Sequence, residues 1–81
     1  MFDNYHYQLT MFYKYNAEPI ASKYFNTKTL TNYFLKEAKI KYGKHHYFSI
    51  ERYITPSGVS PTSIVNFKNE TLREKGVLIE L

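Results

Sequence analysis

The stretch from residue 5 to residue 15 alternates between apolar and polar positions, and this alternation limits the possible folds more than any other feature. The odd positions are aromatic or aliphatic, namely Tyr5, Tyr7, Leu9, Met11, Tyr13 and Tyr15. The even positions are polar except for Phe12. Because successive side chains of a strand point to opposite faces, this period of two predicts a half-buried β-strand. Its apolar face is mostly tyrosine, which suits either a core or a partly exposed contact surface.

The chain has 81 residues and no cysteine. We therefore expect one small domain over residues 1–81, without disulfides or thiolate metal sites. No stretch approaches the ~18 consecutive apolar residues of a membrane span. Residues 1–4 also lack the basic and apolar regions of a signal peptide. These features predict a cytoplasmic protein that does not insert into a membrane.

Residue choice and charge indicate the kind of gene and the kind of partner. Phe, Ile, Lys, Asn and Tyr supply 36 of the 81 residues, and AT-rich codons encode all five. We interpret the gene as one from an AT-rich bacterium, phage or plasmid, so the expected compartment is a bacterial host cell. The formal charge of +4 favours an acidic partner, either nucleic acid or an acidic protein surface. A positive charge also simply keeps an aromatic-rich protein in solution.

The next segments predict a hairpin followed by a helix. Residues 16–19 are predicted to form a turn, and residues 20–25 to return as a second strand. Residues 30–42 follow helical spacing, with Thr29 as the N-cap. Gly43 suits the left-handed conformation that ends many helices.

The predicted helix has two apolar surfaces. Its main stripe lies within one arc of the helix and comprises Leu30, Phe34, Leu35, Ala38 and Tyr42. Tyr33 and Ile40 lie together on a separate flank. In a small protein we expect this flank to be buried against another element, with an exposed contact patch as the alternative.

The remaining segments predict further strands. Residues 45–55 return to a period of two, and a proline- and glycine-containing turn follows. We expect a strand over residues 62–68, a short helical turn over 70–75 and a terminal strand over 77–81. The predicted fold class is α+β, with one main helix packed on a mostly antiparallel sheet of three to five strands.

The residues that usually carry catalysis are sparse. Asp3 is the single aspartate, and the six glutamates are scattered without a close pair. His6 stands apart, and His45 and His46 are neighbours on a predicted strand, where they point to opposite faces. This spacing does not match a metal site. We therefore expect no metal, no cofactor and no enzyme activity of a conventional kind.

Residues 43–47, Gly-Lys-His-His-Tyr, resemble a pattern found in small ribonuclease toxins of bacterial toxin–antitoxin pairs. Some members of that family place a histidine just after a glycine, at the start of a strand that follows a helix. The family's usual serine is replaced here by Lys44, and the rest of the chain does not follow the family. The resemblance implies a ribonuclease toxin, with His45 or His46 in the active site. We rank this hypothesis third, after the two that follow.

Four lysines cluster around the predicted C-terminus of the helix: Lys36, Lys39, Lys41 and Lys44. Cations at this position complement the helix dipole. Together with Tyr33, Tyr42 and Tyr47 as stacking surfaces, they also suit contacts with phosphates and bases. Arginine, which usually leads base readout, occurs only twice. Direct, non-specific nucleic-acid binding through a lysine and tyrosine surface is therefore our alternative hypothesis.

Our main hypothesis is a small non-enzymatic binding module, an accessory protein of a phage or mobile element that inhibits a host protein. The anti-CRISPR proteins and other anti-defence inhibitors are of this type. The order of a tyrosine-bearing strand, a second strand, a helix and a strand resembles the phage inhibitors of uracil-DNA glycosylase. The positive charge disfavours DNA mimicry, so we expect steric blocking instead.

The expected partner is a host protein, for example a nucleic-acid-processing enzyme. Tyrosine is enriched at interface hot spots. The candidate contact residues are Tyr5, Tyr7, Tyr13, Tyr15, Tyr33 and Ile40. A homodimer through an exposed edge strand is a further hypothesis, because short sheets leave edges that need cover.

Overall fold

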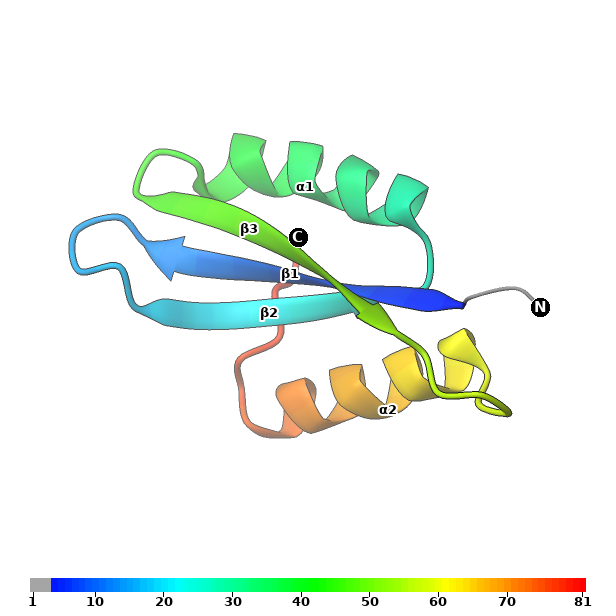
Figure 1. Ribbon diagram of the computed structural model, residues 1–81. Helices are drawn as coiled ribbons and strands as arrows, with labels where there is room; N and C mark the ends of the chain where they lie inside the picture. Colours follow the sequence, from blue (N-terminus) through cyan, green and yellow to red (C-terminus); the bar gives the residue numbers. More distant parts are fainter. Residues whose placement is uncertain (1–3) are drawn as a thin grey trace.

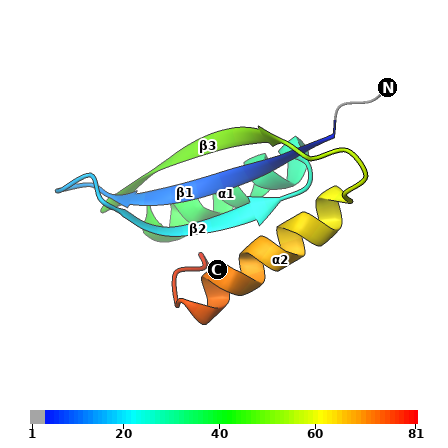
Figure 2. The ribbon, with the colours of Figure 1, turned by 60° about the horizontal axis from the view of Figure 1, so that its bottom comes forward.

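The computed structural model describes residues 4–81, so Asp3 and its neighbours at the N-terminus lie outside it. The elements are β1 (Tyr5–Tyr13), β2 (Pro19–Phe25), α1 (Lys28–Tyr42), β3 (His46–Ile54) and α2 (Pro61–Glu74). The three strands form one antiparallel sheet in the order β2-β1-β3. Helix α1 covers one face of the sheet, and α2 packs beside β2 on the other (Figures 1 and 2). The predicted α+β fold, with its main helix on the sheet, is confirmed.

The core lies between α1 and the central strand. Leu9 and Met11 of β1 are buried and contact Phe25 of β2 and Ile79 of the C-terminal segment. Half-buried apolar residues pack around them, namely Ala21, Phe34, Leu35, Tyr42 and Phe48. The odd positions of residues 5–15 therefore close a core at the middle of the strand. Their tyrosines lie toward its two ends.

Helix α1 begins two residues earlier than predicted, because its N-cap is Thr27 and not Thr29. The Thr27 hydroxyl accepts a hydrogen bond from the Leu30 N–H at 3.1 Å, which satisfies a free donor of the first turn. The expected left-handed conformation of Gly43 is wrong, since its φ is −62°. Space explains the glycine instead: a β-carbon there would collide with the carbonyl oxygen of Lys39.

The strand predicted over residues 62–68 is wrong, because this segment belongs to α2. Pro61 occupies the start of the helix, where its missing N–H costs nothing. Val65 is buried, whereas Phe67, two residues later, is exposed, so the segment does not follow a strand period. The predicted helical turn over 70–75 is the end of α2, and Gly76 follows it with a φ of +74° that favours glycine.

The outer edge of β2 is partly covered. The terminal strand predicted over residues 77–81 is reduced to one parallel bridge between Leu78 and Ser22. The Ser22 N–H donates to the Val77 carbonyl, and the Ile79 N–H donates to the Ser22 carbonyl. The side chain of Asn69 on α2 accepts from the Tyr24 N–H at 2.7 Å and donates to the Tyr24 carbonyl at 2.9 Å. An amide side chain thus replaces a neighbouring strand at this point.

The buried middle of β1 predicts a sharp difference between two leucines. Leu9 is fully buried, whereas Leu30 of α1 is 52% exposed. Leu9→Ala should lower the free energy of unfolding by about 3 kcal/mol, through lost burial and a residual cavity. Leu30→Ala, the same chemical change, should cost less than about 1 kcal/mol. Urea denaturation followed by circular dichroism measures both, and equal losses would show that Leu9 is not the centre of the core.

Candidate binding surfaces

The predicted contact tyrosines of β1 separate into two groups. Tyr5 and Tyr7 lie near the start of the strand, where the Arg52 guanidinium sits 4.4 Å from the centre of the Tyr5 ring. Tyr7 lines a pocket with Lys28, Ile50 and Arg52. Tyr13 and Tyr15 lie at the other end, with their ring centres 5.3 Å apart. Because the core separates the two pairs, these four residues do not form one continuous surface.

Tyr33 and Ile40 are exposed, so the expected burial of this flank is wrong and the alternative, an exposed patch, is correct. Their exposed fractions are 66% and 79%. The physical reason is the position of α2, which packs on the opposite face of the sheet (Figure 2). Lys36 lies between them at helical spacing, on the same side of α1. We call Tyr33, Lys36 and Ile40 the α1 outer face.

The four predicted lysines do not all lie together. Lys36 belongs to the α1 outer face, whereas Lys39 and Lys41 lie in the last turn of α1. The Lys41 ammonium is 5.3 Å from the centre of the Tyr42 ring. Lys44 follows in the loop before β3.

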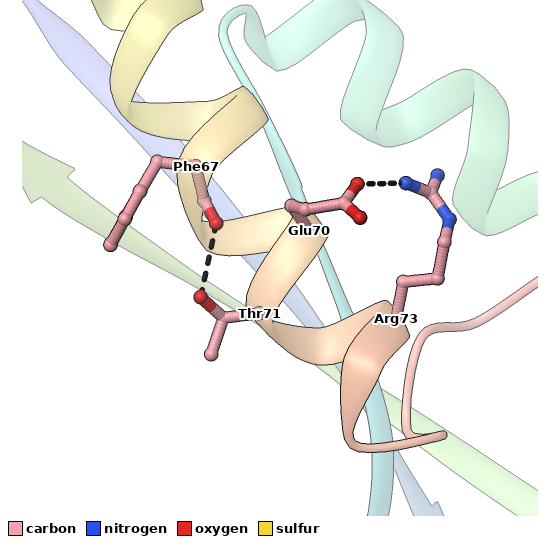
Figure 3. Close-up of polar contacts among 4 residues, drawn as sticks. All are labelled: Phe67, Glu70, Thr71 and Arg73. Atoms are coloured by element: carbon pink, nitrogen blue, oxygen red, sulfur yellow. Dashed lines mark hydrogen bonds and ion pairs between the residues drawn. The ribbon is translucent and has the colours of Figure 1, made fainter.

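None of these lysines has a carboxylate partner within the described residues. The ion pair found in residues 4–81 joins Arg73 and Glu70 on α2, beside the hydrogen bond from the Thr71 hydroxyl to the Phe67 carbonyl (Figure 3). The lysines near the C-terminus of α1 are thus left available for an anionic partner.

The turn between β1 and β2 meets the loop between α1 and β3 at one end of the sheet (Figure 1). The Lys14 N–H donates to the His45 carbonyl at 2.9 Å. The Tyr15 hydroxyl and His45 Nδ1 are 3.3 Å apart. His46 Nδ1 donates to the Tyr42 carbonyl at 3.0 Å. The structure therefore brings Tyr15, a predicted contact residue, next to His45, whereas His46 contacts Tyr13 and Tyr42. The ribonuclease hypothesis stays a prediction.

A polar cluster lies between the sheet and α2, and its centre is His6, which is only 2% exposed. His6 Nε2 is 3.0 Å from the Lys68 ammonium, and His6 Nδ1 is 2.9 Å from the Thr55 hydroxyl. Because an ammonium can only donate, Nε2 accepts and Nδ1 carries the proton that it donates to Thr55. The ring also stacks on Tyr53, with ring centres 5.6 Å apart.

The polar cluster lowers the pKa of His6 and raises the pKa of Tyr53. Burial, and secondarily the charge of Lys68, lower the pKa of His6, so its ring is neutral at pH 7. The Tyr53 hydroxyl lies 2.6 Å from a carboxylate oxygen of Glu51 and 3.0 Å from the Gln8 side-chain oxygen. The hydrogen bond to Glu51, then burial, raises the pKa of Tyr53 to about 12.

Sequence reasoning missed this cluster. His6 occupies an even, polar position of β1, which the alternation assigns to the solvent side. The cover comes from α2, whose first half was predicted as a strand. The sequence did contain an indication of helix α2. Pro61 is a common first residue of helices, and Val65, Lys68 and Asn69 follow it at helical spacing.

The neutral buried His6 predicts a loss of stability in mild acid. The unfolded chain takes up a proton on this residue near pH ~6.5, whereas the folded chain does so at lower pH. The unfolding free energy should therefore fall as the pH is lowered from 7.5 to 5.5. In His6→Gln the fall should be smaller, from a lower starting stability. His45→Gln, at an exposed histidine, is the control and should lose as much stability as the wild type. Urea denaturation at each pH measures the unfolding free energy of the three proteins. An equal fall in the wild type, His6→Gln and His45→Gln would show that His6 is not the group responsible.

The remaining observations do not identify a class of protein. Within residues 4–81, no three histidine, aspartate or glutamate side chains gather closely enough to hold a metal ion. In the same range, no helix has the length and apolar character needed to cross a membrane. Comparisons with protein-family models, with curated proteins and with solved structures found no match.

Proposed function

We propose that this protein is a small non-enzymatic binding module that acts by covering a surface of another protein. The observation that carries the proposal is the exposure of Tyr33 and Ile40 on α1. Tyrosine is a frequent interface anchor. The opposite side of α1 is packed on the core, so the helix presents these two side chains from a rigid support. Binding would remove their apolar surface from water, which is favourable by roughly 25 cal/mol per Å2.

The charge around this surface indicates the chemistry of the partner. Lys36 lies between Tyr33 and Ile40, and Lys39 lies about one turn beyond Lys36. The protein as a whole carries a formal charge of +4. A complementary site is an apolar groove with carboxylates on its rim, because opposite charges at the rim steer association.

The biological role that we propose is stoichiometric inhibition of a host protein in the bacterial cytoplasm. The residue composition supports a phage or mobile element as the source, and the anti-CRISPR or wider anti-defence class as the type of inhibitor. A nucleic-acid-processing enzyme is the partner that we propose first. Steric blocking fits a basic protein better than mimicry of DNA.

The double variant Tyr33→Ala/Ile40→Ala tests this proposal. It should lose a bacterial partner that the wild type captures from lysate in a defined molar ratio, because the two apolar anchors are gone. Its thermal unfolding temperature should change by less than about 4 °C, since both residues are exposed. Capture is read by mass spectrometry, and the ratio by size-exclusion chromatography of the purified complex.

Phe67→Ala provides a matched control, because Phe67 is 74% exposed and lies on the other helix. The control should retain the partner. Retention of the partner by the double variant, or its loss by both variants, would contradict the role of the α1 outer face. Unfolding of the double variant would show that these residues belong to the core.

The free edge of β3 supports the further proposal of a homodimer. Within residues 4–81 nothing pairs with the outer edge of β3, whereas the edge of β2 is partly covered. Antiparallel pairing of two copies about Ile50 would place Arg52 of one copy opposite Phe48 of the other. In this register Glu51 faces Ser49, so no like charges meet directly.

Light scattering during size-exclusion chromatography tests the homodimer. The mass should rise with concentration from 9.7 kDa toward twice that value. Ile50→Lys should keep the protein monomeric, because it places two ammonium groups together on the symmetry axis, whereas Phe67→Lys should not. A wild type that stays monomeric at millimolar concentration would refute the pairing.

A further inference from the structure

Phe12, the apolar exception among the even positions of residues 5–15, has a specific neighbour in the structure. It pairs with Tyr47 across β1 and β3, on the sheet face opposite α1. The two rings are nearly parallel, with centres 5.2 Å apart and an angle of 10° between their planes. Figures 1 and 2 show that this end of the sheet extends beyond α2. The Tyr47 side chain accordingly remains 45% exposed.

Two lysines lie close to this ring pair along the chain. Lys14 lies two residues after Phe12, and its N–H donates to the carbonyl of His45. Lys44 directly precedes His45, and within residues 4–81 neither lysine forms an ion pair. Glu18 lies in the same turn without an ion pair to either lysine. We call Phe12, Tyr47, Lys14, Lys44 and His45 the turn-end platform.

We infer that the turn-end platform binds single-stranded nucleic acid, with a base stacked on Tyr47 and with Lys14 and Lys44 on the neighbouring phosphates. A flat aromatic surface on an open sheet accepts any unpaired base, because every base has a π face. A base inside a duplex cannot reach it. Lysines bind phosphates as point charges and add no base readout, so binding is independent of sequence.

This surface keeps Lys44 and Tyr47 of the lysine and tyrosine set expected from sequence, and the structure adds Phe12 and Lys14 to them. Lys36 and Tyr33 belong to the α1 outer face and do not take part. Tyr42 is engaged elsewhere, since its hydroxyl donates to the Glu80 carbonyl. The platform and the α1 outer face share no residue, so loss of one activity leaves the other intact.

Fluorescence anisotropy with a labelled 20-nucleotide oligothymidine, at 50 and 200 mM NaCl, tests the inference. Tyr47→Leu should weaken binding by about fivefold or more, because it keeps apolar bulk but removes the stacking surface. Tyr47→Phe should bind like the wild type. The double variant Lys14→Gln/Lys44→Gln should flatten the log–log dependence on salt by about 1.4, for two lost phosphate contacts.

The double variant Lys28→Gln/Lys75→Gln removes the same charge at two exposed lysines elsewhere and should retain the affinity and salt dependence of the wild type. Equal losses in the two lysine variants would show unspecific charge attraction and overturn the inference. Affinity for a duplex of the same length, or for polyglutamate, equal to that for the oligothymidine would also overturn the inference. Unchanged binding by Tyr47→Leu, weak binding by Tyr47→Phe, or no binding at 50 mM NaCl would also overturn it. Cleavage of an RNA oligonucleotide would reassign the surface to catalysis.

Discussion

The structure depends on the burial of β1 from both sides. Leu9 on one face is fully buried beneath α1, and His6 on the other face is almost fully buried beneath α2. A chain of 81 residues cannot build a thick core. A central strand with a helix over each face is an economical solution, because one strand then contributes to two packed layers. The two flanking strands and the C-terminal segment complete these layers around it.

The two faces of β1 are held by different physics. On the α1 side the contacts are apolar, and their strength follows from buried area. On the α2 side the contacts are polar and aromatic, with the Lys68 ammonium close to the rings of Tyr24 and Tyr53. Such a layer is stable only when each buried polar group has a hydrogen-bond partner. This condition is met, because both nitrogens of His6 have partners and Asn69 pairs with the backbone of β2.

Two helices are too few to cover the whole sheet, and the surfaces left open are where binding is proposed. Helix α1 packs one side against the core, and Tyr33 and Ile40 on its other side remain exposed to water. Helix α2 packs beside β2 and does not cover the turn end of the same sheet face, where the rings of Phe12 and Tyr47 stack. Within residues 4–81 the outer edge of β3 is also left unpaired. Exposed apolar groups in a small basic protein are thus a direct result of its architecture.

Local patterns in the sequence determined most of the elements. The periods of residues 5–15, 30–42 and 45–55 were visible because they repeat within one element, and the α+β class followed from them. Residues 61–74 were not recognised as one helix, since the run of Ile64, Val65 and Phe67 suits a strand as well. Packing decided this segment: Val65 is buried, and Asn69 bonds to the edge of β2. Only the tertiary structure decided that His6 is covered, that Tyr33 is exposed, and that Tyr15 meets His45 across 30 residues. The reason is physical: periodicity reports which side of an element is apolar, whereas which element covers that side depends on contacts between residues far apart in the chain.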